Sequence, residues 1–534
     1  MHKAVRILVL VLAGVLLASP WYEAVPAWPL FIGFVPLLYL GDKWIKENRR
    51  WRYTFFSVFL AFFVWSAIAT WWICHATVGG GIFAFFVTAF LMAIAFQLSH
   101  SVRKRFGDRM GLVAFVAIWI AYEQFFHNSE VAWPWLTLGN AFGQEVKVIQ
   151  WYEFTGVLGG SLWVLIGNVA AYYAVDSYLK KESRWCWFYV VLFAVLIAAP
   201  AIYSLSLFHS YKEKGSEAKI LVIQPNIDPY GEKFSGMTND QQVDLMLDIA
   251  EQGVTADVDY VVTPETAIDD RIWESSIDQN FTIARFRNFV DSHPRVKWVS
   301  GATTLRLYDV RDTVPPTARK YPMQEGYLYD RFNSAIQIDT TGDYQVYHKS
   351  KLVVGVEMMP YPKYFKMLER LSIDLGGVVG SLGTQQNRGV FVSHDKQFAV
   401  APVICYESVF GEYLAGYIRN GANLIFVVTN DGWWKDTPGY RQHLSYSSIR
   451  AIEMRRSIAR SANTGISAFI NQRGEVLDSL GWWKRGSILG TIKANTQLTF
   501  YAVYGDFIGR IATLVSALFL LLLLSRVLMR KKGS

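Results

Sequence analysis

Long apolar stretches dominate the first 208 residues of the chain and return near its end. Seven stretches, each close to the ~20 residues that cross a bilayer as a helix, cover residues 4–20, 25–41, 53–74, 79–98, 111–127, 155–178 and 185–208. An eighth covers residues 508–528. A charged start and a short apolar core are also typical of a signal peptide, but no small-x-small cleavage site follows the first stretch. The pattern therefore predicts eight transmembrane helices.

The pattern changes after residue 208, where short β-branched runs alternate with segments of helical spacing. Strands are predicted in "KILVIQPN", "VDYVVTPETAI", "QFAVAPVICYE" and "ANLIFVVTND". Helical spacing occurs in "DLMLDIAEQG" and in "RQHLSYSSIRAIEMRRSIARSA". This alternation predicts a layered α/β fold. The chain is thus divided into a transmembrane region (1–208), an α/β domain (209–505) and a final transmembrane helix with a short basic tail (506–534).

Basic residues in the loops predict how these helices are oriented. Lysines and arginines cluster before the first stretch and after the second, fourth, sixth and eighth, whereas the other loops hold almost none except Lys147. The positive-inside rule then places every cluster on the cytoplasmic side and residues 209–505 on the opposite side. The same placement accounts for the net charge of +8. Nucleic-acid binding is therefore not expected.

Composition and cysteine usage agree with a membrane protein. Hydrophobic residues make up 52% of the chain and charged residues 18%. Of three cysteines, Cys74 and Cys186 lie in apolar stretches, so Cys405 is the single thiol of a domain expected in an oxidising compartment. A disulfide within that domain is thereby excluded. The histidines show no metal-ligand spacing, so neither a metal nor a cofactor is expected, and His443, on a predicted helix, is expected to be a structural donor.

Three polar residues each follow an apolar strand, where the ligand sites of α/β proteins collect. They are Glu265 in "VVTPET", Lys349 in "QVYHKSKLV" and Cys405 in "APVICYE". A carboxylate can take the proton of a thiol and so activate it as a nucleophile, while an ammonium can stabilise an oxyanion. Each residue also has an ordinary interpretation, as a surface cap, a solvated charge and core packing respectively. Spacing alone leaves both interpretations open.

The order of these residues, with "PET", "YHK" and "CYE" around them, resembles the triad of the nitrilase, or carbon–nitrogen hydrolase, superfamily. Seven spans, a nitrilase-like domain and one final span resemble the apolipoprotein N-acyltransferase family over nearly the whole chain. Further similar stretches are "WPWLTLGNAF", "IQPNI", "FNSA", "VVTNDGWW" and "YGDFIGR". The resemblance implies a polytopic α-helical membrane protein that carries an αββα nitrilase-like domain.

The resemblance also implies a ping-pong acyl transfer that needs no cofactor. In this reaction Glu265 deprotonates Cys405, which takes an acyl chain from a membrane phospholipid as a thioester. Lys349 and the backbone amide of Tyr406 stabilise the oxyanion, and the α-amine of the diacylglyceryl-cysteine of an apolipoprotein then accepts the acyl chain. The family implies a multi-pass protein of the bacterial inner (cytoplasmic) membrane with its catalytic domain on the periplasmic side. We expect a monomer.

Supporting roles follow from the same resemblance. Glu357 lies eight residues after Lys349, within a run, "KLVVGVEMMPYP", that departs from the family's usual sequence, and is expected to be a second essential glutamate. Tyr406 and Glu407 are expected to position the substrate. Candidate contacts to the acyl chain or to the bilayer interface are Phe234, Trp433 and Trp434. Ordinary aromatic packing is an equally good interpretation of the tryptophans.

Two other classes of function remain as alternatives. A membrane-anchored amidase acting on a small amide would share the triad and use water in place of the amine, but eight spans exceed what an anchor requires. A transporter or scaffold with a non-catalytic outer domain would not require the three residues together. The predicted spans also hold few ionisable residues, chiefly Glu123 and Asp176, whereas such residues usually mark a transport pathway.

Overall fold

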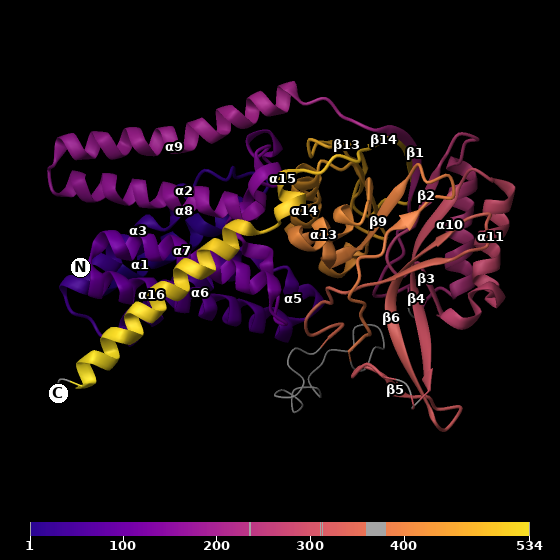
Figure 1. The fold of residues 1–534 in the computed structure, drawn as a ribbon, viewed down its shortest axis with the longest axis horizontal. Coiled ribbons are helices and arrows are strands. Elements are labelled where there is room, and N and C mark those ends of the chain that lie inside the picture. The colour runs from indigo at the N-terminus through magenta and orange to yellow at the C-terminus, as the bar shows by residue number, and fades with distance from the viewer. Residues whose placement is uncertain (1, 234–235, 310, 312, 359–380, 533–534) are drawn as a thin grey trace. The chain divides into compact units, whose positions relative to one another are not determined.

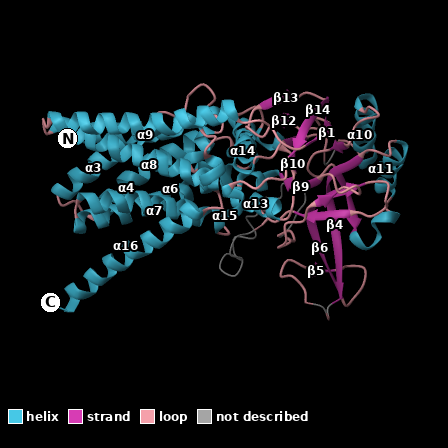
Figure 2. Ribbon diagram, turned by 45° about the horizontal axis from the view of Figure 1, so that its top comes forward, coloured by secondary structure: helices cyan, strands magenta, loops and turns pink. Residues whose placement is uncertain are grey.

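The computed structural model of this chain describes residues 2–233, 236–309, 311, 313–358 and 381–532 (Figure 1). Two compact units make up the chain: Met1–Tyr211 with Tyr504–Ser534, and Lys212–Val503. The first unit is helical, and the second combines helices with strands (Figure 2). The predicted combination of apolar helices and an α/β domain is confirmed.

Seven helices of the helical unit are long and apolar enough to cross a membrane, counted over the described residues. They are Lys3–Ala18 (α1), Trp51–Thr70 (α4), Val78–Phe106 (α6), Asp108–Asn128 (α7), Tyr152–Leu179 (α8), Ser183–Ser210 (α9) and Phe507–Lys532 (α16). An α-helix satisfies its backbone hydrogen bonds internally, as the hydrocarbon core of a bilayer requires. These helices correspond to seven of the eight predicted spans. A short helix, α5 (Ile73–Ala76), lies between α4 and α6.

The second predicted span, residues 25–41, differs because it is broken into two shorter helices. Helix α2 (Leu30–Gly33) is followed by α3 (Val35–Lys46), whose first turn contains a proline. Proline lacks a backbone N–H and favours the start of a helix over its interior. Asn168 of α8 compensates at the break, since its side chain accepts the Phe34 N–H at 2.8 Å and donates to the Leu30 carbonyl at 2.7 Å.

Two β-sheets form the centre of the mixed unit. The eight-stranded sheet has the order β14 (Gly486–Ala494), β1 (Ser216–Gln224), β2 (Tyr260–Val262), β4 (Lys297–Asp309), β6 (Tyr327–Ile338) and β5 (Arg319–Lys320), with β3 (Ile268–Trp273) beside β4 and β7 (Gln345–His348) beside β6. The six-stranded sheet has the order β13 (Val476–Leu480), β12 (Ser467–Ile470), β11 (Ile458–Ala462), β10 (Leu424–Thr429), β9 (Ala399–Ile404) and β8 (Phe391–Val392). Strand β1 contacts β11 and β12, so the two sheets pack face to face.

Helices cover the outer face of each sheet. Helices α10 (Asn239–Gly253) and α11 (Phe281–Ser292) pack on the first sheet, and α13 (Gly411–Arg419) and α14 (Pro438–Met454) pack on the second. The prediction of a helix as far as residue 462 was wrong: the left-handed conformation of Arg455 ends α14, and the following residues form strand β11. The short helix α15 (Phe500–Tyr504) follows β14. The result is the αββα arrangement that the resemblance implied.

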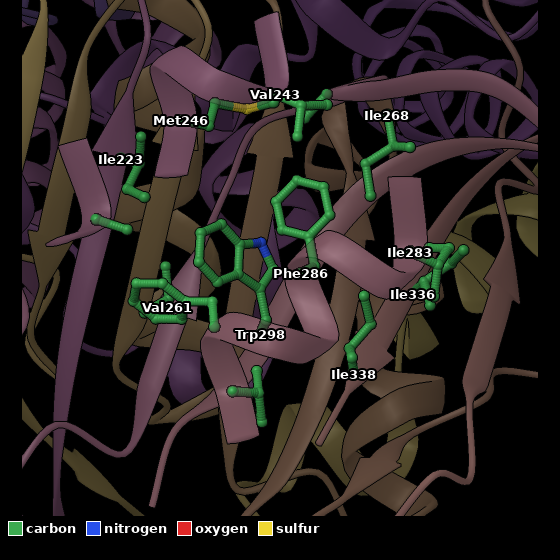
Figure 3. Packing of buried hydrophobic residues seen from close by; sticks show 14 of the residues in the cluster. Ile223, Val243, Met246, Val261, Ile268, Ile283, Phe286, Trp298, Ile336 and Ile338 are labelled. Atoms are coloured by element: carbon green, nitrogen blue, oxygen red, sulfur yellow. The ribbon is translucent and has the colours of Figure 1, made fainter. Parts of the chain in front are cut away.

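The core beneath α10 and α11 is built from alternating apolar positions of the strands. Figure 3 shows Phe286 of α11 against Trp298 of β4, with ring centroids 4.8 Å apart. Ile336 and Ile338, two residues apart on β6, point into the same cluster. Each fully buried side chain of this kind contributes roughly 1.5–3 kcal/mol to folding. Gln337, the residue between them on β6, faces the opposite side of the sheet.

Parallel strands determine where the polar loops meet. Strands β1, β2 and β4 are parallel to one another, as are β9, β10 and β11. Parallel neighbours end at the same edge of a sheet, and ligand sites of such sheets lie beyond these carboxyl ends. The loops that follow β2 and β9 hold the residues described next.

Candidate active site

The three residues predicted from strand ends lie together in the mixed unit. Glu265 is in the loop after β2, Lys349 directly follows β7, and Cys405 directly follows β9. The ammonium Nζ of Lys349 donates to Glu265 Oε1 at 2.9 Å, and the Cys405 thiol lies near enough to the Glu265 carboxylate that each shifts the pKa of the other. All three are buried, with exposed fractions of 7% for Glu265, 1% for Lys349 and 9% for Cys405. A base, a cation and a thiol therefore share one enclosed site.

A second carboxylate, Glu357, completes a closed set of hydrogen bonds. Lys349 Nζ donates to Glu357 Oε1 at 2.9 Å. Asn333 Nδ2 donates to the same two carboxylates, at 2.8 Å to Glu265 Oε1 and 2.9 Å to Glu357 Oε1. Glu357 Oε2 also accepts the Val353 N–H at 2.8 Å, which orients the carboxylate. A buried and a half-buried carboxylate thus share two donors, one charged and one neutral.

Asn333 was not predicted as a site residue. It lies inside β6 rather than at a strand end, so a pattern of polar residues after strands does not include it. The signal that was available is the "FNSA" stretch, in which an amide stands among aromatic and small residues; its burial is seen only in the structure. A buried polar side chain requires partners, and these partners are the two carboxylates.

The charges of this cluster stabilise one another. Burial alone would raise the pKa of Glu265, but the Lys349 ammonium and its hydrogen bonds outweigh burial, so the pKa is lowered. Burial would likewise lower the pKa of Lys349, but Glu265 and Glu357 raise it well above its usual value. At neutral pH Glu265 is therefore a carboxylate and Lys349 an ammonium.

The pKa of the Cys405 thiol is shifted so that its neutral form is favoured. Burial and the negative charge of Glu265 raise the pKa of Cys405, and the nearby Lys349 opposes them only in part. The resting thiol is consequently protonated and lies near an ionised carboxylate. This is the arrangement of a nucleophile with its general base, in which the proton leaves as the new bond forms.

The loop after Glu265 is held by a buried lysine. Lys233 Nζ donates to Thr266 Oγ1 at 2.6 Å and to the Glu265 carbonyl at 3.2 Å. Thr266 has a φ of 48°, a left-handed conformation that L-residues adopt at a cost. Burial lowers the pKa of Lys233 to about 8, although Glu265 and Asp269 act in the opposite direction. These contacts keep the Glu265 side chain aimed at Cys405.

The backbone at Cys405 forms a strained elbow between β9 and a short 3₁₀ turn, Cys405–Val409. Its φ of 49° is left-handed, which costs about 1–3 kcal/mol for a residue with a side chain. The Cys405 carbonyl compensates by accepting Ser408 Oγ at 2.7 Å and lying 3.2 Å from His443 Nε2. The turn therefore holds the thiol in a fixed direction.

A fully buried ionic network lies behind the elbow. His443 Nδ1 is 2.9 Å from Asp431 Oδ1, and Arg460 Nη2 donates to Asp431 Oδ2 at 2.7 Å. Burial would raise the pKa of Asp431, but Arg460 and His443 outweigh it and lower the pKa. We call these three residues the elbow network. It connects α14 and β11 to the nucleophile without contacting the thiol's proton acceptor, Glu265, in the described hydrogen bonds.

Glu407 is fully engaged with the protein. Its Oε1 accepts the hydroxyls of Tyr347 and Tyr413, each at 2.7 Å, and the Ser350 N–H at 2.7 Å. Its Oε2 accepts the Ile404 N–H at 2.9 Å. Glu407 thus ties the loop that carries Lys349 to the strand that carries Cys405. Its predicted role in positioning the substrate stays a prediction.

The other predicted contacts are aromatic. The Tyr406 ring packs on Phe410 with centroids 5.1 Å apart. Trp433 packs on Tyr230 at 5.4 Å, and the Trp434 ring lies 5.6 Å from that of His443. Both tryptophans are half-buried. Phe234 lies outside the described residues, and contact of these side chains with an acyl chain stays a prediction.

Comparison with known proteins gives matches in both units. Residues 13–170 match the family model of the apolipoprotein N-acyltransferase N-terminal domain, and residues 222–500 match that of the carbon-nitrogen hydrolases. The apolipoprotein N-acyltransferase of Chlorobaculum tepidum is 30% identical over 94% of this chain and 93% of its own length. Those of Geobacter metallireducens and Thermotoga maritima are each 25% identical, over 93% and 89% of this chain and 91% and 86% of their own lengths.

Proposed function

Because this chain belongs to the apolipoprotein N-acyltransferase family, we propose that Cys405 carries an acyl chain from a membrane phospholipid to the N-terminal amine of an apolipoprotein. The observation that carries this proposal is that the Cys405 thiol, the Glu265 carboxylate and the Lys349 ammonium share one buried site. The similarity of the helical unit to these acyltransferases favours this function over a membrane-anchored amidase and over a transporter or scaffold.

In the first half-reaction Glu265 takes the thiol proton while Cys405 Sγ forms a bond to the ester carbonyl carbon of the phospholipid. The carbonyl oxygen becomes an oxyanion, stabilised by Lys349 Nζ and the backbone N–H of Tyr406. Collapse of this intermediate breaks the carbon–oxygen bond, and Glu265 returns the proton to the departing lysophospholipid. The product on the enzyme is a thioester.

In the second half-reaction the α-amine of the diacylglyceryl-cysteine attacks the thioester carbonyl. The amine gives its proton to Glu265, the carbon–sulfur bond breaks, and Cys405 regains a proton from the same carboxylate. Glu357 supports this cycle by sharing Lys349 with Glu265, which keeps a counter-charge on the ammonium while Glu265 is protonated. Lys349 Nζ and the Tyr406 N–H, the two donors to the oxyanion, therefore serve both half-reactions.

We further propose an inner-membrane location with the mixed unit on the periplasmic side and a monomeric protein. The distribution of lysines and arginines among the loops supports this orientation. Both substrates are lipids, which accounts for a catalytic domain on a membrane-spanning chain. A diacylated apolipoprotein is then the acceptor and a bilayer phospholipid the donor.

The test is to incubate the full-length protein in detergent with a phospholipid whose acyl chains carry an alkyne. The wild type should become labelled, the label should be released by neutral hydroxylamine, and a diacylglyceryl-cysteine peptide should discharge it as an amide. Cys405→Ser should remain unlabelled under the same conditions. Folded wild type that takes no label, or label that survives hydroxylamine, would overturn the thioester mechanism.

A further inference from the structure

The face of β6 that carries Asn333 continues beyond the catalytic carboxylates with a basic residue. Residues two apart on a strand share a face and lie ~7 Å apart, so Arg331 is the neighbour of Asn333 on the side of the catalytic carboxylates. Asn333 touches both Glu265 and Glu357. Arg331 therefore stands one strand repeat from the catalytic cluster.

Two further arginines converge on this position from neighbouring strands. Strand β5 lies beside β6 (Figure 1). Their pairing sets Arg319 opposite Tyr329, which places Arg319 on the same face as Arg331. Arg271 lies in β3, at the irregularity of pairing between Ile268 and Ile272, with a φ of 49°. Bulges of this kind redirect a side chain beside functional sites.

The positive charges of Arg271 and Arg319 both act on Arg331. Burial lowers the pKa of Arg331, and the positive charges of Arg271 and Arg319 lower it further, against the effect of Asp269. Proteins seldom gather like charges in a half-buried place without a counter-charge. The acidic neighbours of the three arginines therefore decide whether the group keeps a net positive charge.

Among the residues that the structure describes, carboxylates only partly neutralise the three arginines. Asp269 Oδ1 lies 3.6 Å from Arg331 Nη2 and already accepts Thr303 Oγ1 at 2.7 Å. Asp330 also acts on Arg319, but burial raises the pKa of Asp330. Arg271 is exposed and makes no hydrogen bond or ion pair with any described residue. Three cations thus have two acidic neighbours, and no described carboxylate lies within hydrogen-bond distance of the three guanidinium groups.

We propose that Arg271, Arg319 and Arg331 bind the phosphate group of the glycerophospholipid acyl donor. The planar guanidinium presents paired N–H donors that match phosphate oxygens. In such a lipid the glycerol backbone separates the ester from the phosphate by a few bonds, a separation similar to one strand repeat. A phosphate at Arg331 therefore leaves an ester within reach of the Asn333 end of the face, where Cys405 and its base lie. The inference rests on the acyl transfer proposed above.

The experiment compares two donors that differ only in the phosphate head group. Full-length protein in detergent is given alkyne-tagged phosphatidylglycerol or a diacylglycerol with the same tagged acyl chains, and the rate of thioester formation is measured. The variants are Arg331→Gln and Arg271→Gln, and Arg331→Lys retains the charge. Because Arg271 is exposed, its substitution leaves the fold intact and covers the case in which Arg331→Gln does not fold.

Arg306→Gln is the matched control. Arg306 is opposite Asp330 on the β4–β6 pair, on the other face of the hairpin, where it pairs with Glu274 at 2.7 Å. Its loss removes one arginine charge from β4, the strand next to β6, without changing the proposed phosphate site. It should leave the ratio of the two donor rates unchanged.

We expect wild type to react faster with phosphatidylglycerol than with diacylglycerol. Arg331→Gln and Arg271→Gln should slow the phosphatidylglycerol reaction, for Arg331 by roughly tenfold to a hundredfold as for a lost charge-assisted hydrogen bond, and leave the diacylglycerol rate unchanged. Equal losses on both donors, or no loss on either, would overturn the phosphate site while leaving the acyl transfer intact. If the wild type forms a thioester with neither donor, the proposed function itself is overturned.

Discussion

Two buried ionic clusters lie on either side of Cys405, and they differ in what their carboxylates touch. In the catalytic cluster Lys349 binds Glu265 at 2.9 Å, and in the elbow network Arg460 binds Asp431 at 2.7 Å. Asp431 has only fixed partners, since Thr429 Oγ1 and His443 occupy its other oxygen. Glu265 instead contacts a thiol. Burial and ion pairing are common to both, so the contact with a nucleophile distinguishes the reactive cluster.

The comparison assigns different tasks to the two clusters. The catalytic cluster moves a proton, and its loss should appear in the rate of the reaction. The elbow network holds the strained backbone of Cys405, and its loss should appear in the stability of the fold. Substitutions that exchange one carboxylate for its amide test this difference most directly, because they alter charge and leave shape unchanged.

The largest expected effect is that of Glu265→Gln on catalysis. Loss of the base should slow thioester formation by about 10²–10⁴-fold, because the raised pKa of Cys405 leaves the thiol protonated. The midpoint of thermal unfolding should change little, since Glu357 still neutralises Lys349. Labelling by tagged phospholipid and a thermal scan measure the two quantities. Glu217→Gln, at an exposed carboxylate, is the control, and a variant that unfolds early with normal labelling would contradict the assignment.

Asp431→Asn should give the reverse pattern. It leaves Arg460 and His443 buried without a counter-charge, which destabilises a protein by about 3–5 kcal/mol. Because the pKa of Asp431 is lowered in the fold, its contribution is complete above the ordinary aspartate pKa and is lost as the pH falls through the folded value. Unfolding at neutral and acidic pH tests this, with the exposed Asp248→Asn as control. Wild-type stability in Asp431→Asn would show that the network is not structural.

The smallest effect sharpens the comparison within the catalytic cluster. Asn333→Ala removes a neutral hydrogen bond from each glutamate, so thioester formation should fall roughly tenfold. Glu265 must be ionised to act as the base, so the rate falls at acidic pH as the carboxylate becomes protonated in the folded protein. In the wild type this fall lies below the ordinary glutamate pKa, because Lys349 and Asn333 lower the pKa of Glu265 against the effect of burial. In Asn333→Ala this fall of the rate should move to higher pH. An unchanged pH dependence would mean that Asn333 does not act on Glu265.

Prediction from the sequence succeeded where chemistry coincides with a strand end. Glu265, Lys349 and Cys405 each interrupt an apolar run, and this interruption makes them recognisable from the amino-acid pattern. Asn333 and Arg331 lie within β6, where polar residues at alternate positions look like an ordinary half-exposed strand. Their importance depends on which face of the strand is turned towards the site, and that is determined by pairing with β4 and β7.

The elbow network shows a second limit of prediction. Asp431 follows β10, His443 lies on α14, and Arg460 lies on β11. Nothing in the spacing of these residues links them, because the parallel pairing of β10 with β11 brings them together. The broken second span has a local cause instead: the proline that begins α3 is visible in the sequence, whereas its compensation by Asn168 is not.

The spacing of the two ion pairs of Lys349 has a consequence for how the site is assembled. Glu357 is eight residues from Lys349 along the chain, whereas Glu265 is 84 residues away. Closing the shorter loop costs less conformational entropy, and short-range contacts generally form before long-range ones. The ammonium therefore acquires a counter-ion during early folding, before β2 and β7 have joined the same sheet. As the ribosome extends the chain, both glutamates and the lysine precede Cys405, so the acid–base pair can be in place before its reactive sulfur is made.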